Sequence, residues 1–233
     1  MKIIKAMLVS IFILGVCRPA GAESFDVKSL KYFADVDLFT VGTAENRLED
    51  QLRADRAAGD IEHYNLETNA AIGGRIGVLH PIEDLADVGL SWGYIAGPNG
   101  SWQANAFKRQ EINRRFFRLL AEVQRTFQIN DRFSLLGGAG LGMAWGRQEF
   151  VTEYQAAAWE NGVVVDTFDQ HFHGFTWELS AGMTYKATEK LSVDLGVRYA
   201  GFPHAPNAHD VYNRQEIPGM DWNSFGIFTG VRF

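Results

Sequence analysis

Apolar and polar residues alternate with a period of two along eight segments of the chain. In 191–202, Leu191 and Val193 lie on one face of an extended segment, and Ser192 and Asp194 lie on the other. Alternation over this length is typical of β-strands with one apolar and one polar face. The segments predicted as strands are 30–41, 64–79, 88–97, 114–128, 133–146, 172–186, 191–202 and 222–233.

The connections between these segments alternate in length. The long, polar connections are 42–63, 98–113, 147–171 and 203–221. The short connections lie near 80–87, 129–132 and 187–190. This rhythm predicts an antiparallel up-and-down meander of eight strands, with the long loops at one end and the short turns and both termini at the other. A soluble β-sandwich would show the same alternation, but it has no reason to show the asymmetry in loop length.

The polar face of these strands carries charged residues, together with glycine and serine. A closed barrel of eight strands has an interior just wide enough to be filled by side chains. Because buried charges must be paired, we expect an ion-pair network inside the barrel rather than an open pore, with the small residues leaving room for long side chains. The charged residues predicted to form this network are Lys31, Asp35, Asp37, Glu67, Arg75, Arg118, Glu122, Glu178, Lys186, Asp194, Arg198 and Arg232.

Aromatic residues gather at both ends of the predicted strands. Such rings prefer the interface between membrane and water, so two aromatic belts are expected. The alternative is ordinary cross-strand pairing of aromatic residues in a soluble sheet. The predicted belt on the short-turn side comprises Tyr32, Phe127, Phe133, Tyr185 and Phe233. The predicted belt on the long-loop side comprises Phe39, Tyr64, Tyr94, Phe117, Trp145, Trp177 and Phe225.

The first 22 residues have the pattern of a cleaved signal peptide. Lys2 and Lys5 precede the apolar stretch 7–16, which is too short to cross a bilayer as a helix, and Ala20-Gly21-Ala22 forms a cleavage site. A barrel domain is therefore expected over 23–233. The whole chain has a formal net charge of −6, and removing the basic leader makes the remainder more acidic, which argues against nucleic acid as a partner.

The last predicted strand ends in phenylalanine and carries apolar residues or threonine at alternating positions. It is similar to the signal that the barrel-assembly machinery reads, and the residues that carry this similarity are Phe225, Ile227, Thr229, Val231 and Phe233. Together with the signal peptide, the eight strands and the loop rhythm, this strand resembles the small outer-membrane β-barrel family, which includes OmpA- and OmpX-type barrels and opacity-type surface proteins.

The resemblance implies an all-β, eight-stranded antiparallel transmembrane barrel in the outer membrane of a Gram-negative-type bacterium. The loops would be extracellular and both mature termini periplasmic. Outer-membrane lipid, lipopolysaccharide and the barrel-assembly machinery would be its partners, and no cofactor is expected. The role that follows is structural, adhesive or surface-protective, because members of such a family differ in activity.

Three other functions can be considered from the residues. A lipid-modifying enzyme of the lipid A deacylase type would need a His-x-Ser pair on the outer barrel face, and the segment 198–202 has neither residue. A soluble lipocalin-like binder would need an apolar interior. His171 and His173 could place two imidazoles on one face for a metal, although loop histidines are more often solvated.

The third long connection carries a hairpin signal. Asn161-Gly162 lies between two segments rich in β-forming residues, and this pair tolerates the positive φ angles of a two-residue turn. We therefore expect the fifth and sixth strands to continue beyond the membrane as a β-ribbon. Its exposed edge makes the 147–171 connection the expected place for a surface partner.

Overall fold

The computed structural model describes the chain in several stretches. These are residues 29–42, 57–58, 63–65, 70–82, 85–97, 99–105, 108–155, 163–205, 208–209, 216–217 and 220–233. The chain divides into two units, Met1–Leu30 and Lys31–Phe233, and the second unit contains the strands. The expected signal peptide over 1–22 and its cleavage site lie outside the described residues, as does Glu67.

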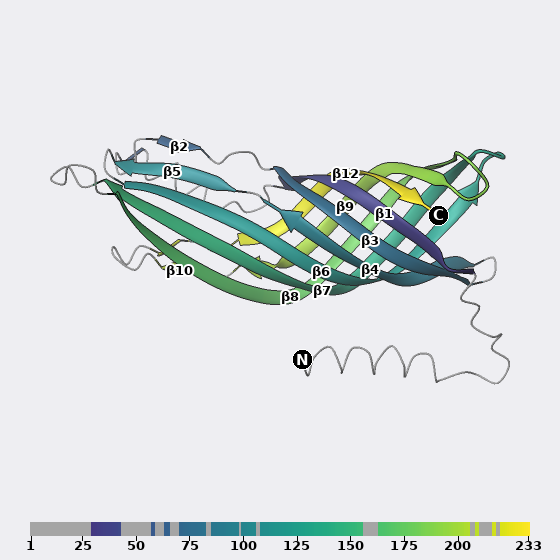
Figure 1. Cartoon of the computed structure of the whole chain (residues 1–233), viewed down its shortest axis with the longest axis horizontal. Coiled ribbons are helices and arrows are strands. Elements are labelled where there is room, and N and C mark those ends of the chain that lie inside the picture. Colours follow the sequence, from purple (N-terminus) through teal and green to yellow (C-terminus); the bar gives the residue numbers. More distant parts are fainter. Residues whose placement is uncertain are drawn as a thin grey trace, which may run out of the picture. The chain divides into compact units, whose positions relative to one another are not determined.

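Eight long antiparallel strands form a closed ring, as the alternation predicted (Figure 1). Around the ring they are β1 (Lys31–Gly42), β3 (Ala70–Ile82), β4 (Ala86–Ala96), β6 (Lys108–Gln128), β7 (Phe133–Gln155), β8 (Val163–Lys186), β9 (Ser192–Ala205) and β12 (Met220–Arg232). The short strands are β2 (His63–Asn65), β5 (Gly100–Asn105), β10 (Ala208–His209) and β11 (Glu216–Ile217). In the part of the chain that the structure describes, no helix has the length and apolarity needed to cross a membrane.

The ring closes between its first and last long strands. β1 and β12 pair from Phe33 opposite Arg232 to Gly42 opposite Asn223. At the short-turn end, Tyr32 and Phe233 exchange two backbone hydrogen bonds of 2.8 and 2.9 Å. The ladder thus continues to the last residue of the sequence, and no strand edge remains in this part of the ring.

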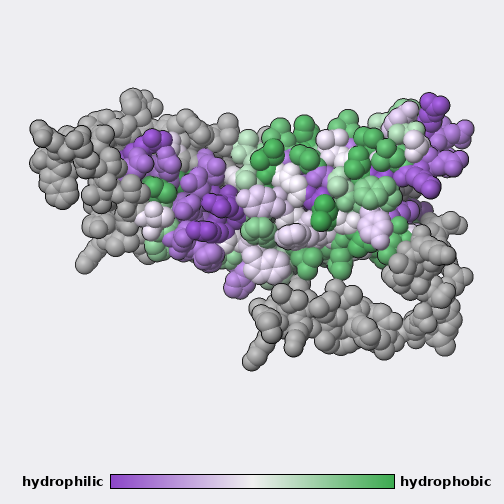
Figure 2. Space-filling view, in the orientation of Figure 1, coloured by the Kyte–Doolittle hydropathy of each residue, from purple (hydrophilic) through white to green (hydrophobic). Residues whose placement is uncertain are grey.

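The two faces of the ring are reversed relative to a water-soluble protein. Large apolar side chains point outward, and Ile72 and Leu195 are 59% and 63% exposed. Charged side chains point inward, and Arg118 and Arg198 are each 1% exposed. Figure 2 shows the apolar surface as a zone between two hydrophilic ends. A ring with this distribution is suited to an apolar surrounding, because exposing its apolar outer face to water would be energetically unfavourable.

Aromatic side chains lie on the outer surface near both ends of the apolar zone. On the long-loop side, the Tyr94 and Phe117 rings are 4.9 Å apart, and Trp145 lies opposite Phe117 on the next strand. On the short-turn side, the Phe133 and Tyr185 rings are 5.1 Å apart. Phe39 does not lie in the long-loop belt.

Phe39 was expected in that belt, but it is fully buried inside the barrel. The physical reason is its phase in β1. Val36 and Leu38 point outward, so Phe39 must point inward with Asp35 and Asp37. The side chain of Tyr64 lies outside the described residues.

Three strands extend well beyond the aromatic belt. β6, β7 and β8 include residues 108–113, 147–155 and 163–171. These residues were expected in the long connections, and only the ribbon around Asn161-Gly162 was predicted to be β-structure. The pairing of β7 with β8 continues to Gln155 opposite Val163, which confirms that both strands project as a ribbon. The Asn161-Gly162 turn itself lies outside the described residues.

The extension is wider than a two-stranded ribbon. β5 pairs with β6, and β2 pairs with β5, so the sheet order there is β2-β5-β6-β7-β8. Several of its described outward residues are charged. Arg147 and Asp169 form an ion pair of 2.6 Å, and Arg115 lies 3.6 Å from Glu149. We define the extension as β5 with residues 108–115, 147–155 and 163–173, and its charged outer face is suited to water.

Among the described residues, the β8 strand has a paired neighbour on only one side over the extension. Its pairing with β9 runs from Lys186 to Trp177 and stops at Gly201 on β9. Pro203 follows, and a Cβ added at Gly174 would lie 2.7 Å from the Pro203 Cβ. Proline has no N–H to donate, so the ladder cannot continue through this position.

Amide exchange tests this arrangement directly. In β7, residues 147–153 have β6 on one side and β8 on the other, so every amide there should exchange slowly. In β8, only alternate amides of residues 167–175 point toward β7, so slow and fast exchange should alternate. Hydrogen exchange by NMR on the bilayer-embedded chain measures both segments. Fast exchange throughout 147–153 would contradict the extended sheet.

Candidate functional site in the barrel interior

The interior of the barrel holds a central cluster of seven charged side chains. They come from five strands, and each is at most 6% exposed. The cluster consists of Asp35 and Asp37 on β1, Arg75 on β3, Arg118 and Glu122 on β6, Glu178 on β8 and Arg198 on β9. The period-two alternation places all of them on the inward face, as the sequence predicted. Four carboxylates therefore meet three guanidinium groups.

Arg75 connects three carboxylates across the barrel. Its Nη2 donates to Asp35 Oδ2 at 2.5 Å, on the neighbouring strand. Its Nη1 donates to Glu122 Oε1 at 2.6 Å and to Glu178 Oε1 at 2.5 Å. The link to Glu178 joins residues 103 positions apart in the chain. A planar guanidinium is suited to this role, because it presents several donors in fixed directions.

The other two arginines complete the cluster. Arg118 Nη1 donates to Glu178 Oε2 at 2.6 Å, and its Nη2 lies 3.7 Å from Asp37 Oδ2. Arg198 donates to Asp37 through Nη1 and to Asp35 Oδ2 at 2.8 Å through Nη2. These contacts give each aspartate a basic partner, so β1 is tied to both halves of the ring.

Neutral side chains complete the surroundings of Glu122. Ser91 donates its hydroxyl proton to Glu122 Oε1. Gln124 Nε2 donates to Glu122 Oε2 at 2.9 Å. Together with Arg75, these donors satisfy both oxygens of a carboxylate that is nearly removed from water.

A second charged group lies nearer the short-turn end. Lys31 Nζ is 2.8 Å from Asp87 Oδ1, and Arg232 Nη2 is 2.9 Å from Asp194 Oδ2. Arg232 also donates to Gln124 at 3.0 Å, which connects this group to the central cluster. Asp87 had been assigned to a turn near 80–87, but β4 begins at Ala86. Its inward position could have been read from the alternation, since Val88 and Leu90 occupy the outer face.

Lys186 does not join the predicted network. Its side chain is exposed at the short-turn mouth, where it lines a cavity of about 670 Å³ together with Lys31 and Arg232. The reason is its position at the end of β8. Its side chain points toward the inside of the barrel, but it lies at the open mouth. Its ammonium group therefore stays in water.

Small residues make room for the long charged side chains. A Cβ added at Gly93 would lie 3.0 Å from Arg118 Nε. A Cβ added at Gly230 would collide with Asp35 Oδ1. Glycine is thus required at position 230 and favoured at position 93, because a charged side chain from the neighbouring strand lies directly over the backbone.

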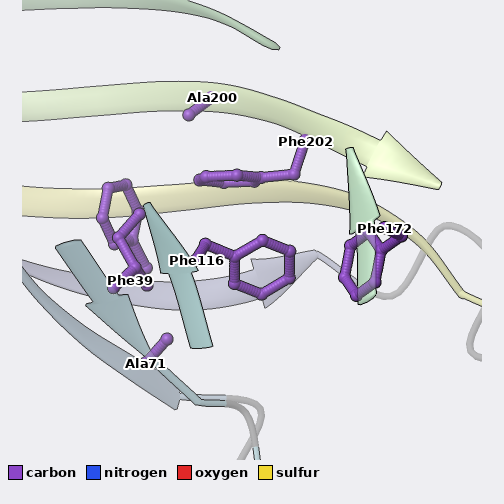
Figure 3. Packing of buried hydrophobic residues seen from close by; sticks show 7 residues of the cluster. Phe39, Ala71, Phe116, Phe172, Ala200 and Phe202 are labelled. Atoms are coloured by element: carbon purple, nitrogen blue, oxygen red, sulfur yellow. The ribbon is translucent and has the colours of Figure 1, made fainter. Parts of the chain in front are cut away.

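An aromatic layer lies inside the barrel, on the long-loop side of the central cluster (Figure 3). The Phe116 ring centroid is 5.5 Å from those of Phe172 and Phe202, and the Phe39 and Phe202 centroids are 6.2 Å apart. Sequence reasoning missed this layer and predicted a charged interior throughout. The signal was available, because Phe116 has the same phase as Arg118.

The described residues contain no group of three or more histidine, cysteine, aspartate or glutamate side chains placed to hold a metal ion. His171 and His173 lie on the outward face of the extension and are exposed. The segment 198–202 turns Arg198 and Ala200 into the barrel and exposes Tyr199.

Residues 52–233 match the family described as outer membrane protein beta-barrel domain. The crystal structure of Neisserial surface protein A is similar, with a TM-score of 0.50 and 12% identity over 88% of this chain and 96% of that one. The structure of the outer membrane protease OmpT of Escherichia coli has a TM-score of 0.46 and 10% identity, over 92% of this chain and 99% of that one. The structure of the N-terminal barrel of Pseudomonas aeruginosa OprF has a TM-score of 0.36 and 12% identity, over 88% of this chain and 98% of that one.

No curated protein matches the chain in sequence. At identities of this size, the similarity to Neisserial surface protein A concerns the fold, and functions have to be argued from the residues of this chain.

Removing Arg75 should destabilise the folded barrel strongly. Arg75→Ala would leave Asp35, Glu122 and Glu178 with one base fewer in a buried cluster, and breaking a buried pair typically costs about 3–5 kcal/mol. Arg115→Ala removes an exposed partner of Glu149 and serves as the control, with an expected cost of about 0–1 kcal/mol. The free energy of unfolding in urea, measured in lipid bilayers, compares the two variants. Equal effects would show that the central cluster does not hold the ring together.

Proposed function

We propose, from the premise that the chain belongs to the outer membrane protein beta-barrel domain family, that it is a non-enzymatic surface protein with an adhesive or protective role. In this proposal the long-loop end is extracellular, and the mature termini are periplasmic after removal of residues 1–22. Residues 23–233 then form the barrel domain. The observation that carries the proposal is the water-suited extension with its unpaired β8 edge.

The exposed edge has the chemistry needed to bind a protein strand. From Val163 to Thr176, β8 pairs only with β7 in the part of the chain that the structure describes. Unpaired backbone N–H and C=O groups on such an edge can hydrogen-bond an added strand, which gives affinity without a deep pocket. The opposite side of the extension is covered by β5 and β2. We therefore place the surface partner of the 147–171 region on β8.

The interior supports a structural rather than a conducting role. The central cluster and the aromatic layer occupy successive levels of the barrel, and their members are buried. Outer-membrane phospholipid and lipopolysaccharide would contact the apolar outer face. A lipid A deacylase-like enzyme is less well supported, because 198–202 presents Tyr199 outward and neither histidine nor serine.

Shortening the ribbon tests the adhesive role. Arg147 lies opposite His171, so deleting 148–170 and joining these two residues through Asn-Gly removes residues 163–170 of the unpaired edge and should leave the membrane-embedded ring intact. Bacteria that carry this variant should attach to a matrix-coated surface no better than cells without the protein. Replacing only 156–162 by a Gly/Ser segment of equal length keeps the edge and should keep attachment. A shift in gel mobility on boiling confirms that each barrel is folded.

The two variants separate the edge from the connecting segment. If the shortened protein attaches as well as the wild type, the adhesive proposal fails. If the Gly/Ser variant also loses attachment, the contact lies in 156–162 and not on the β8 edge.

The last strand has the geometry expected of an assembly signal. Phe225, Ile227, Val231 and Phe233 all point outward, with Phe233 62% exposed, and Thr229 lies in the same phase. An apolar row on the outer face would be accessible to the barrel-assembly machinery before the ring closes. We retain this role as a proposal.

Deleting Phe233 should slow insertion in cells more than it weakens the assembled barrel. The deletion removes one closing backbone pair with Tyr32 and one ring contact of 6.1 Å, which is a small part of the seam. Pulse labelling followed by the gel-mobility assay measures the insertion rate, and urea unfolding measures stability. Insertion at the wild-type rate would contradict the assembly role.

A further inference from the structure

Arg114 is a buried cation in the extension, and no carboxylate in the described part of the chain forms an ion pair with it. It lies on the inward face of β6, one rung above Phe116, and is 4% exposed. Its position is fixed by the backbone. Gly97 donates its N–H to the Arg114 carbonyl at 2.9 Å, and the Arg114 N–H donates to Asn99 Oδ1 at 3.2 Å.

The other arginines that point into the barrel differ from Arg114 in their partners. Arg75, Arg118, Arg198 and Arg232 each form at least one ion pair of 2.9 Å or less with an acidic side chain. The guanidinium of Arg114 makes one long contact, from Nε to Gln148 Oε1 at 3.5 Å. Its Nη2 is buried and has no hydrogen-bond partner, and no described carboxylate forms an ion pair with the group.

The layer around Arg114 is polar but uncharged. Gln148 lies directly opposite Arg114 and donates through Nε2 to Gln170 Oε1 at 2.6 Å. Gln110 and Thr152 form the next polar layer, with Gln110 Nε2 3.5 Å from Thr152 Oγ1. These amides and hydroxyls can donate hydrogen bonds without adding positive charge.

Apolar layers isolate this cation from the carboxylates of the central cluster. Phe150 and Phe172 are buried on its two sides along the barrel. Arg118 lies four residues along the strand, roughly 13 Å away. The Arg118 guanidinium is 5.9 Å from the centroids of both Phe39 and Phe202, so these rings lie at the boundary of the cluster. The excess carboxylate of the cluster is therefore not a direct partner for Arg114.

Arg114 remains a cation under ordinary conditions. Burial lowers the pKa of its guanidinium to about 10, which is still well above neutral pH. An uncompensated buried charge is costly, and an added counter-charge with good hydrogen-bond geometry offsets that cost. The missing partner should be an anion with at least two acceptor oxygens, because a guanidinium binds such groups through parallel N–H donors.

We propose that Arg114, with Gln148 and Gln170, forms a binding site for a small oxyanion inside the extension. The ligand class is a sulfate, phosphate or carboxylate group, either free or carried by a sugar. Arg114 supplies the charge and the unpartnered Nη2 donor, and the glutamine amides orient the anion. This site lies apart from the outer edge of β8 and does not depend on the proposed adhesion.

Titration of the full chain in bilayer nanodiscs tests the site. Sodium sulfate replaces sodium chloride at constant ionic strength, and the ¹⁵N signal of Arg114 Nε is followed by NMR. The expected result is a saturable shift in the millimolar range. Arg114→Gln should abolish saturable sulfate binding, measured on the side-chain amide of Gln148. Arg115→Gln, which changes the exposed neighbouring arginine, should leave the binding unchanged.

Two further probes identify the source of the anion. Inorganic phosphate and glucuronate are titrated in the same way. Tighter binding of glucuronate by about tenfold, or 1.4 kcal/mol, would assign the site to a sugar-borne carboxylate, and tighter sulfate or phosphate to a free oxyanion. A wild-type Nε signal that shows no saturable shift with any probe would overturn the proposal. This result stands even if Arg114→Gln does not fold.

Discussion

The structure depends on the pairing of charges that have been removed from water. An apolar surrounding outside the ring favours apolar side chains on the outer face, so the charged residues at that level face inward. Once inside, each carboxylate and guanidinium loses its contacts with water. Hydrogen bonds and ion pairs with other side chains have to replace those contacts. Arg75 illustrates the result, since it reaches carboxylates on β1, β6 and β8. The backbone ladders join only neighbouring strands, whereas this arginine joins opposite walls.

The interior is layered because each rung across the strands has a single chemical character. The Arg114 rung is polar, the Phe116 rung is aromatic and the Glu122 rung is ionic. The aromatic layer separates the ions from the water-facing extension, so their mutual attraction is less screened. Breaking an ion pair of the ionic layer is therefore expected to cost far more than breaking the exposed ion pair of Arg147 and Asp169.

The alternation of the sequence predicted the ring and the inward or outward direction of most side chains, because both depend only on local phase. Asp87 and Phe116 were not predicted although their phase is visible, because Asp87 lies next to a turn and Phe116 is an apolar residue on an otherwise polar face. Other features could not be read locally. The contact between Arg198 and Asp35 spans 163 positions, and the stop of the β8–β9 ladder depends on Pro203 meeting Gly174. Pairings of this kind are set by the three-dimensional register.

The seam between β1 and β12 has a consequence for the order of folding events. The carboxylates of Asp35 and Asp37 belong to the first long strand, and Arg198 to the seventh. These ions can meet only when nearly the whole chain is available, so the contact order is high and folding is expected to be slow. Until then the chain exposes both unpaired charge and apolar strands, which is the condition that favours aggregation. The buried charges of the central cluster become paired only as the ring closes.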